Sequence, residues 1–246
     1  MTNVGIKKDD ENERLNTRNQ DFNKDWYFKL NDTTDESGKE VDTQDWSKLD
    51  LPHDWSIYLN FDHNSPARNE GGQLNGGIAW YRKTFSVDDV NKDKNVRINF
   101  DGVYMDSSVY VNGKLVGHYP NGYNHFSYDI TDFLTKDGSQ NSIAVKVVNK
   151  QPSSRWYSGS GIYRDVRISY TDKVHVVENG TKITSPNLAK QYGGLVDTVV
   201  GSKVVNNDNK DYDIYVEHQI FTKEGQPVTG VIKSEIKHIN KGEAVL

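Results

Sequence analysis

The 246-residue sequence contains no cysteine, which excludes disulfide bonds, thiolate metal sites and cysteine nucleophiles together. It also lacks any run of about 18 consecutive apolar residues, the length that a helix needs to cross a bilayer. No basic cluster occurs and the net charge is −5, so nucleic acid and anionic membranes are not expected as main partners. None of these absences decides between a cytoplasmic and an exported protein.

The N-terminal segment has no apolar core of the kind that a signal peptide requires. It is rich in Asn, Asp, Glu, Lys and Arg, a composition that buries little apolar surface. We therefore expect residues 1–20 to form a disordered lead-in, with ordered structure from residue 21.

Helical periodicity is almost absent from the rest of the chain, and the pattern is typical of short strands separated by turns. Residues 80–85, 96–100, 142–148 and 165–170 carry the alternation or the aromatic and β-branched content of strands. Residues 129–134 predict one helical turn, with Asp129 or Thr131 as its cap. The 14 Tyr, 8 Phe and 5 Trp supply a core despite a hydrophobic fraction of only 34%.

The strongest local signal is Asn112-Gly113 between two short apolar runs, 108–111 and 114–116. Asn-Gly favours the type I′ turn of a two-residue hairpin, because both positions need a positive φ. Many short strands punctuated by turns indicate an antiparallel sandwich. The sequence thus predicts an all-β fold, with a jelly-roll domain over residues 21–172.

Residues 173–246 have a different composition, with longer predicted strands at 194–205, 212–222 and 231–239. These strands are typical of the start of an immunoglobulin-like sandwich, which normally has about seven strands. The segment is too short for all of them, so we expect an incomplete domain. Uncovered apolar faces and strand edges would then favour self-association.

Five ordered motifs carry a resemblance to a known family. They are Leu51-Pro-His-Asp-Trp55, Gly77-Ile-Ala-Trp-Tyr-Arg-Lys-Thr-Phe85, Val109-Tyr-Val-Asn-Gly-Lys-Leu-Val-Gly117, Gly122-Tyr-Asn-His-Phe-Ser-Tyr-Asp-Ile-Thr-Asp-Phe-Leu134 and Arg155-Trp-Tyr-Ser-Gly-Ser-Gly-Ile-Tyr-Arg-Asp-Val166. Together they resemble the N-terminal sugar-binding domain of glycoside hydrolase family 2, and bacterial β-galactosidases in particular. The resemblance implies a jelly-roll, galactose-binding-like sandwich. The segment after residue 170 is similar to the start of that family's immunoglobulin-like domain.

The resemblance implies a retaining glycosidase whose two catalytic glutamates lie on a TIM barrel downstream of both sandwiches. A barrel typically takes about 250 residues, so this chain has no room for one. The family's acid/base follows an asparagine, and Asn69-Glu70 occurs here, but in a loop of the wrong domain. We therefore expect no catalytic residue in the chain, and no activity from this portion alone.

Arg155 and Trp156 match the family segment that approaches the barrel mouth. A charged fork beside an aromatic face suits a pyranose, so both residues are candidates for contact with the substrate of the whole enzyme. A role in the domain–barrel interface alone is the alternative. Some β-galactosidases bind sodium through an Asp two positions before this Trp, and Ser154 stands there in this chain, which argues against a metal site.

Asp54 is the third candidate for substrate binding, because a carboxylate can accept hydrogen bonds from sugar hydroxyls. The structural alternative is that it caps a turn or pairs with an arginine such as Arg82 or Arg164. The long polar loop 60–77 is open to two interpretations, a part of the sugar subsite or plain disorder.

No metal and no cofactor are expected, since the seven histidines lack ligand spacing and no glycine loop precedes a helix. Three hypotheses remain for the function. The first is a non-catalytic scaffold that shapes the β-galactoside site and supports the enzyme's own TIM barrel. The second is a freestanding carbohydrate-binding module, and the third is the same portion of a β-glucuronidase or β-mannosidase.

Overall fold

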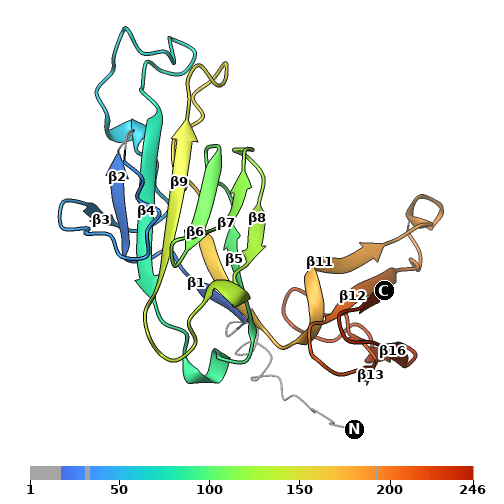
Figure 1. Cartoon of the computed structure of the whole chain (residues 1–246). Coiled ribbons are helices and arrows are strands. Elements are labelled where there is room, and N and C mark those ends of the chain that lie inside the picture. The colour runs from blue at the N-terminus through green and yellow to red at the C-terminus, as the bar shows by residue number, and fades with distance from the viewer. Residues whose placement is uncertain (1–17, 31–33, 192, 246) are drawn as a thin grey trace. The chain divides into compact units, whose positions relative to one another are not determined.

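The computed structural model describes residues 18–30, 34–191 and 193–245 (Figure 1). The chain divides into a first compact unit that ends at Tyr170 and a second that begins at Thr171. In the described ranges the secondary structure is strands and short 3₁₀ turns, which confirms the all-β prediction. Within the same ranges, no helix combines the length and apolar character needed to cross a membrane.

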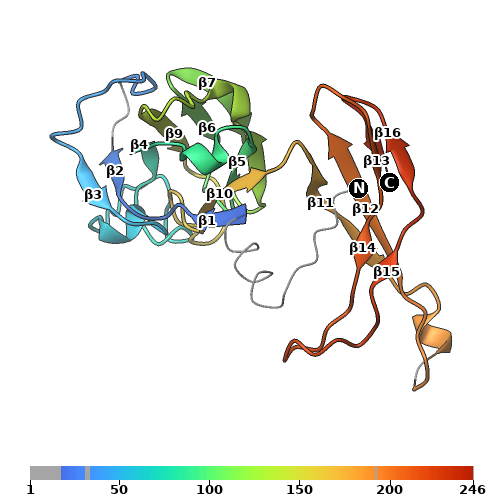
Figure 2. The same ribbon diagram turned by 90° about the horizontal axis from the view of Figure 1, so that it is seen from below.

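The first unit is a sandwich of two sheets, which Figures 1 and 2 show from two directions. The larger sheet has the order β3-β2-β4-β9-β6-β7 and the smaller one β1-β10-β5-β8. The larger sheet consists of β2 (Trp26–Leu30), β3 (Ser47–Leu49), β4 (Gly77–Phe85), β6 (Ser107–Val111), β7 (Lys114–Tyr119) and β9 (Asn141–Asn149). The smaller one consists of β1 (Asn19–Asp21), β5 (Asn95–Phe100), β8 (Phe126–Asp129) and β10 (Val166–Thr171). Three 3₁₀ turns connect them: η1 (Ser56–Tyr58), η2 (Asp89–Asn91) and η3 (Thr131–Phe133).

The core lies between the two sheets, where alternate residues of each strand point inward. Across the larger sheet, Tyr81 pairs with Phe28 on one side and with Val145 on the other, and Val145 pairs with Val109. All four belong to the same apolar cluster, which residues of the smaller sheet such as Ile98 complete. Each such side chain contributes about 1.5–3 kcal/mol on burial, so this row anchors the sandwich.

The β6–β7 hairpin forms as its sequence predicts. Asn112 and Gly113 have φ angles of 49° and 79°, the two positive values of a type I′ turn. The Asn112 side chain also donates to the backbone carbonyl of Phe133 and to the side-chain Oδ1 of Asn141, each at 2.8 Å. The 3₁₀ turn predicted nearby is η3, where Asp129 accepts a hydrogen bond from the Thr131 amide at 2.9 Å.

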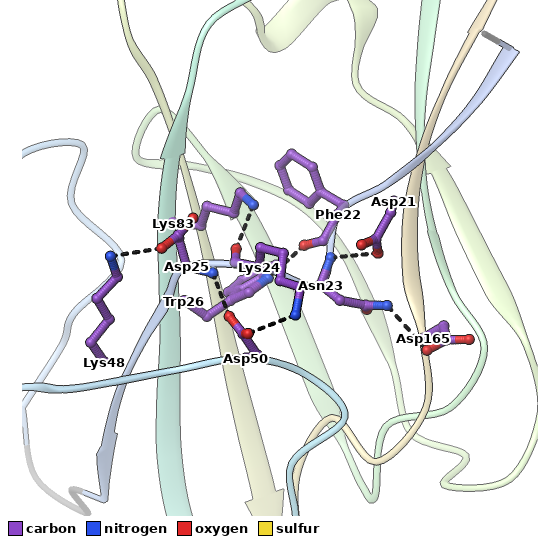
Figure 3. A network of polar contacts seen from close by, with 10 residues as sticks. All are labelled: Asp21, Phe22, Asn23, Lys24, Asp25, Trp26, Lys48, Asp50, Lys83 and Asp165. Atoms are coloured by element: carbon purple, nitrogen blue, oxygen red, sulfur yellow. Dashed lines mark hydrogen bonds and ion pairs between the residues drawn. The ribbon is translucent and has the colours of Figure 1, made fainter. Parts of the chain in front are cut away.

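Residues 21–26 carry the chain from the smaller sheet to the larger one, and Figure 3 shows the polar contacts that fix this crossing. The Trp26 indole donates to the Phe22 carbonyl at 2.7 Å. Lys83 donates to the Lys24 carbonyl at 2.6 Å, with its ammonium 4.3 Å from the centre of the Phe22 ring. Asp50 accepts from the Asp25 amide at 2.9 Å. The crossing is therefore held by one buried and one exposed bond to backbone carbonyls, together with the surface ion pairs Lys24–Asp50 and Lys48–Asp25.

The expected lead-in over residues 1–20 overlaps β1, so its last residues belong to the sandwich. Asn19 and Gln20 pair with Ser169 and Ile168 of β10. The prediction failed here because this edge strand contributes backbone hydrogen bonds and few apolar side chains, so its polar sequence carries no strand signal. Residues 1–17 lie outside the described residues.

The second unit contains one three-stranded sheet and two short ladders. The sheet has the order β11-β12-β17, and the ladders pair β13 with β16 and β14 with β15. The elements are β11 (Val174–Thr184), η4 (Leu188–Lys190), β12 (Val199–Asn206), β13 (Tyr212–Ile214), β14 (Glu217–His218), β15 (Ile232–Lys233), β16 (Lys237–Ile239) and β17 (Ala244–Val245).

The long strands expected at 212–222 and 231–239 are each broken in two. At the break the Val216 amide donates to the Ser234 hydroxyl at 2.9 Å, and the Ser234 amide donates back to the Val216 carbonyl at 2.9 Å. A side-chain oxygen thus replaces a backbone carbonyl in the ladder, which ends the regular pairing.

We predict that Gly113→Ala lowers stability more than Gly138→Ala does. Both glycines have a positive φ, so each alanine is strained by about 1–2 kcal/mol. A methyl group on Gly113 would also lie 3.2 Å from the Lys39 amide nitrogen, whereas nothing lies within 4 Å at Gly138. Urea unfolding of both variants measures the difference, and equal losses would contradict the close contact between the hairpin and residue 39.

Candidate functional site

Three segments meet at one end of the first unit, and Figure 1 shows two of them, loop 60–77 and the loop after β9, side by side. The third segment, residues 53–56, is bonded through its backbone to the end of the β9 loop. The His53 amide donates to the Ile162 carbonyl at 2.8 Å, and the Trp55 amide donates to the Ser160 carbonyl at 3.0 Å. We call these three segments the loop end.

Asp54 lies at the centre of the loop end and acts as a common acceptor. Its Oδ1 accepts from the amides of Ser56 at 3.0 Å and Ser160 at 2.9 Å. Its Oδ2 accepts from the Tyr157 hydroxyl at 2.6 Å. Burial and this bond raise the pKa of Tyr157, so the hydroxyl stays protonated and keeps donating. We call this arrangement the Asp54 clamp.

Glycine is required beside the clamp. Gly159 has a φ of 77°, and a Cβ built there would lie 2.8 Å from Asp54 Oδ2. Gly161 has a φ of 122°, and its Cβ would lie 2.3 Å from the Tyr81 hydroxyl. A side chain at either position would move the loop away from Asp54 or from the core.

A buried polar cluster lies beneath the clamp. Ser160 is fully buried, and its hydroxyl accepts from the Asn149 amide group at 2.7 Å and from the Ser56 hydroxyl at 2.6 Å. Asn149 also donates to the Gly159 carbonyl at 3.0 Å. Buried polar groups that are satisfied in this way hold one conformation, because any other would leave a donor or acceptor without a partner.

Loop 60–77 is an ordered part of the loop end. Gln151 accepts from the Gly76 amide at 2.8 Å and donates to the Leu74 carbonyl at 3.0 Å, which ties the loop to the end of β9. Within the loop, the Asp62 amide donates to the Gln73 carbonyl at 2.9 Å. Of the two interpretations of this loop, disorder is therefore wrong. Glu70 is exposed on it.

Arg155 and Trp156 lie on the exposed side of the loop end. The Trp156 side chain is 58% exposed, and its indole nitrogen donates to the Tyr123 hydroxyl at 3.1 Å. Tyr123 in turn packs edge-on against Tyr104, with ring centres 5.4 Å apart. For Arg155, which is also exposed, the described residues provide no hydrogen bond or ion pair. The indole is thus held in place while its face stays open to solvent.

The comparisons with known proteins identify the family to which this fold belongs. The sequence profile described as "Glycosyl hydrolases family 2, sugar binding domain" matches residues 19–172. The chain belongs to glycosyl hydrolase family 2. It is 43% identical over 209 residues to a β-galactosidase of Bacteroides ovatus, covering 85% of this chain and 24% of that protein.

Other family 2 relatives carry different names. A β-glucuronidase of Formosa agariphila is 27% identical over 246 residues, covering 91% of this chain and 24% of that protein. A solved family 2 structure from Bacteroides cellulosilyticus is 30% identical with a TM-score of 0.80, covering 93% of this chain and 30% of that one. The chain therefore spans about a quarter to a third of the length of these relatives.

The arginines considered as partners of Asp54 have other contacts. Arg82 is buried and donates to the carbonyls of Glu36 at 2.6 Å and Lys39 at 3.0 Å. The Arg164 guanidinium lies 5.3 Å from the centre of the Tyr163 ring. The structure agrees with the turn-capping alternative, because the Asp54 carboxylate accepts from the amide of Ser56, two residues further along the chain.

Sequence reasoning missed two residues that hold the loop end from outside it, Tyr123 and Asn149. Tyr123 is 33 residues from Trp156 in the chain, and only the fold brings them together. Asn149 ends a strand and looks like an ordinary turn residue. The polar residues that follow this apolar strand could have pointed to Asn149. Such residues are common at strand ends, however, so they do not single out a site.

We predict that Asp54→Ala lowers the free energy of unfolding by about 2 kcal/mol, because it removes a charged acceptor from two amides and a hydroxyl. Tyr157→Phe removes one of these bonds and should cost less. Urea unfolding gives both values. A loss from Tyr157→Phe as large as that from Asp54→Ala would contradict the central place of the carboxylate.

We also predict that the pKa values of two histidines are shifted in opposite directions. His53 packs against Phe28, with ring centres 4.7 Å apart, and burial lowers its pKa below 6.5. Exposed His238 donates a hydrogen bond to the Asp213 carboxylate at 2.8 Å, which raises the pKa of this histidine above 6.5. NMR titration of the two rings measures both values directly, and a His53 pKa above 6.5 would contradict its burial.

The lowered pKa of His53 also makes the stability of the fold depend on pH. As the pH drops through about 6.5, His53 binds a proton in the unfolded chain but not yet in the folded chain. The free energy of unfolding therefore falls as the pH drops through this value. His53→Gln should remove this part of the pH dependence. Urea unfolding at several pH values checks it, and an unchanged slope in the variant would assign the dependence to other groups.

Proposed function

We propose that this chain is the non-catalytic sugar-binding portion of a retaining, β-galactosidase-like glycoside hydrolase. In the whole protein its loop end would border the sugar site of a downstream TIM barrel and help to shape it. The observation that carries the proposal is the exposed Trp156 indole, fixed by Tyr123 on loops that the Asp54 clamp holds together.

The physical chemistry of the loop end fits this role. An indole with an open face can stack on the C–H face of a pyranose, and it needs no ordering when it does so. Arg155 beside it offers a planar set of donors to sugar hydroxyls. Both carboxylate oxygens of Asp54 already accept hydrogen bonds within the clamp. We therefore assign Asp54 the positioning of this loop rather than the main contact with sugar.

Hydrolysis itself requires two carboxyl groups about 5–5.5 Å apart for retention of configuration. We place both on the barrel, in the part of the family that this chain does not cover. Because specificity is set mainly there, relatives named β-galactosidase and β-glucuronidase are both compatible with this portion. Identity does not choose between these activities, because a β-galactosidase and a relative named "Putative beta-glucuronidase" are each 43% identical to this chain, over 209 and 173 residues respectively.

A freestanding carbohydrate-binding module is the second candidate function. The exposed Trp156 and Arg155 favour it, since such a surface could hold a sugar without any barrel. Self-association through the second unit stays a prediction, supported by exposed apolar residues there such as Leu195 and Ile236.

The 246-residue chain is expected to release no chromophore from p-nitrophenyl β-galactoside, because the catalytic carboxylates lie elsewhere. The whole protein, expressed from its complete gene, is expected to hydrolyse it with retention at the anomeric carbon. Robust turnover by the chain alone, or inversion by the whole protein, would overturn the proposal.

In the whole protein, Trp156→Ala is predicted to raise KM by about tenfold, the loss of one stacking contact with its buried area. Leu115→Ala is the matched control, since Leu115 is 54% exposed on β7, away from the loop end. Steady-state kinetics compare the two. An unchanged KM in both Trp156→Ala and Arg155→Ala would limit these residues to contact between domains.

A further inference from the structure

A second concave site lies at the opposite end of β4 from the loop end. It is a cleft of about 650 Å³, within the range of small-molecule sites. From Gly77 at the loop end to Thr84 in the cleft, β4 extends roughly 23 Å. Its lining comes from Tyr27 on β2, from residues 39–43, from residues 82–84 on β4 and from residues 140–142 at the start of β9.

The floor of the cleft is the outer face of the larger sheet. Tyr27 pairs with Arg82, and Thr84 pairs with Ser142, so these four residues form two neighbouring rows on one face. The same face carries Trp80, which is fully buried. A covered outer face of this kind differs from the usual solvated side of an antiparallel sheet.

One wall of the cleft, residues 39–43, is fixed to the floor. The Arg82 guanidinium donates to the carbonyls of Glu36 and Lys39, one at each end of the turn that leads into the wall. Val41 packs with Trp46 in the apolar cluster on the outer face. The cleft is therefore preformed, and a ligand would not have to order the wall.

The charges that remain available in the cleft decide the class of ligand. Arg82 is committed to backbone carbonyls, and Lys83 donates away from the cleft to the Lys24 carbonyl at 2.6 Å. Lys39, Glu40 and Asp42 are exposed, and the five charged lining residues together leave one net positive charge. An anionic ligand would meet the two exposed carboxylates, whereas Arg82 and Lys83 already direct N–H groups to backbone carbonyls.

Neutral polar groups supply the rest of the lining, namely the side chains of Thr43, Thr84, Gln140 and Ser142. Tyr27, half-buried on the floor, offers an aromatic surface, and Val41 is the one aliphatic side chain among the lining residues. Hydroxyl, amide and carboxylate groups beside an aromatic ring match a neutral polyhydroxylated ligand. They do not match a lipid, which needs an apolar lining.

We propose that this cleft is a second carbohydrate-binding site, for a neutral glycan, separate from the loop end. It holds a sugar chain at a place where the protein performs no chemistry, and its occupation does not depend on the proposed function of the loop end.

The test is a titration of the full 246-residue chain with cellotriose and with β-1,4-galactotriose, followed by ¹⁵N–¹H NMR. We expect amide shifts at Val41, Thr43 and Thr84 with either probe at concentrations up to about 10 mM, well above a millimolar Kd. Digalacturonic acid, the anionic probe, should bind no more tightly than the neutral sugars.

Glu40→Ala combined with Asp42→Ala removes two exposed carboxylate acceptors from the wall and should weaken binding by about tenfold. Asp89→Ala combined with Asp93→Ala removes the same charge from exposed positions outside the cleft and should leave binding unchanged. Thr84→Trp, which fills the cleft from an exposed strand position, should abolish binding.

Three results would overturn the proposal. They are the absence of shifts with both neutral sugars, tighter binding of digalacturonic acid, and shifts confined to the loop end that persist in Thr84→Trp. The last result would assign sugar binding to the loop end alone. Failure of the cleft thus remains distinct from failure of the proposed function, which the KM of the Trp156→Ala enzyme reports.

Discussion

The carboxylate of Asp54 is the acceptor on which the loop end depends. Its three donors are the Ser56 amide, the Tyr157 hydroxyl and the Ser160 amide. The last two belong to the segment that carries Trp156. Because Gly159 passes so close to Oδ2 that no side chain fits there, the path of that segment follows the carboxylate closely. The exposure of the indole is a consequence of this path and not of a lack of structure around it.

This arrangement separates two tasks within one sandwich. The apolar row through Tyr81 supplies stability, while the polar cluster of Ser56, Asn149 and Ser160 supplies a single loop conformation. A rigid loop can present Arg155 and Trp156 to a neighbouring domain or to a sugar with little loss of entropy on binding. At the other end of β4, Arg82 does the same for residues 39–43 by donating to backbone carbonyls.

The sequence allowed prediction of those features that depend on neighbouring residues. The Asn112-Gly113 turn and the strands around it follow from local backbone preference, so they were predicted correctly. The edge strand at residue 19 was missed because its pairing uses backbone groups that every residue possesses. The break at Val216 was missed because it depends on Ser234, which is 18 residues away. In the site, contact of Arg155, Trp156 and Asp54 with substrate stays a prediction, and the partners of Asp54 and Trp156 are set by contacts distant in sequence.

The pairing of β1 with β10 has a consequence for the synthesis of the protein. Asn23, just after β1, donates to Asp165, 142 residues further along the chain, and the two strands pair beside this contact. The smaller sheet cannot close until nearly the whole first unit has left the ribosome, whereas the β6–β7 hairpin can form as soon as its own residues emerge. Until then Phe22 and Trp26, both buried in the folded core, lack part of the apolar surface that covers them.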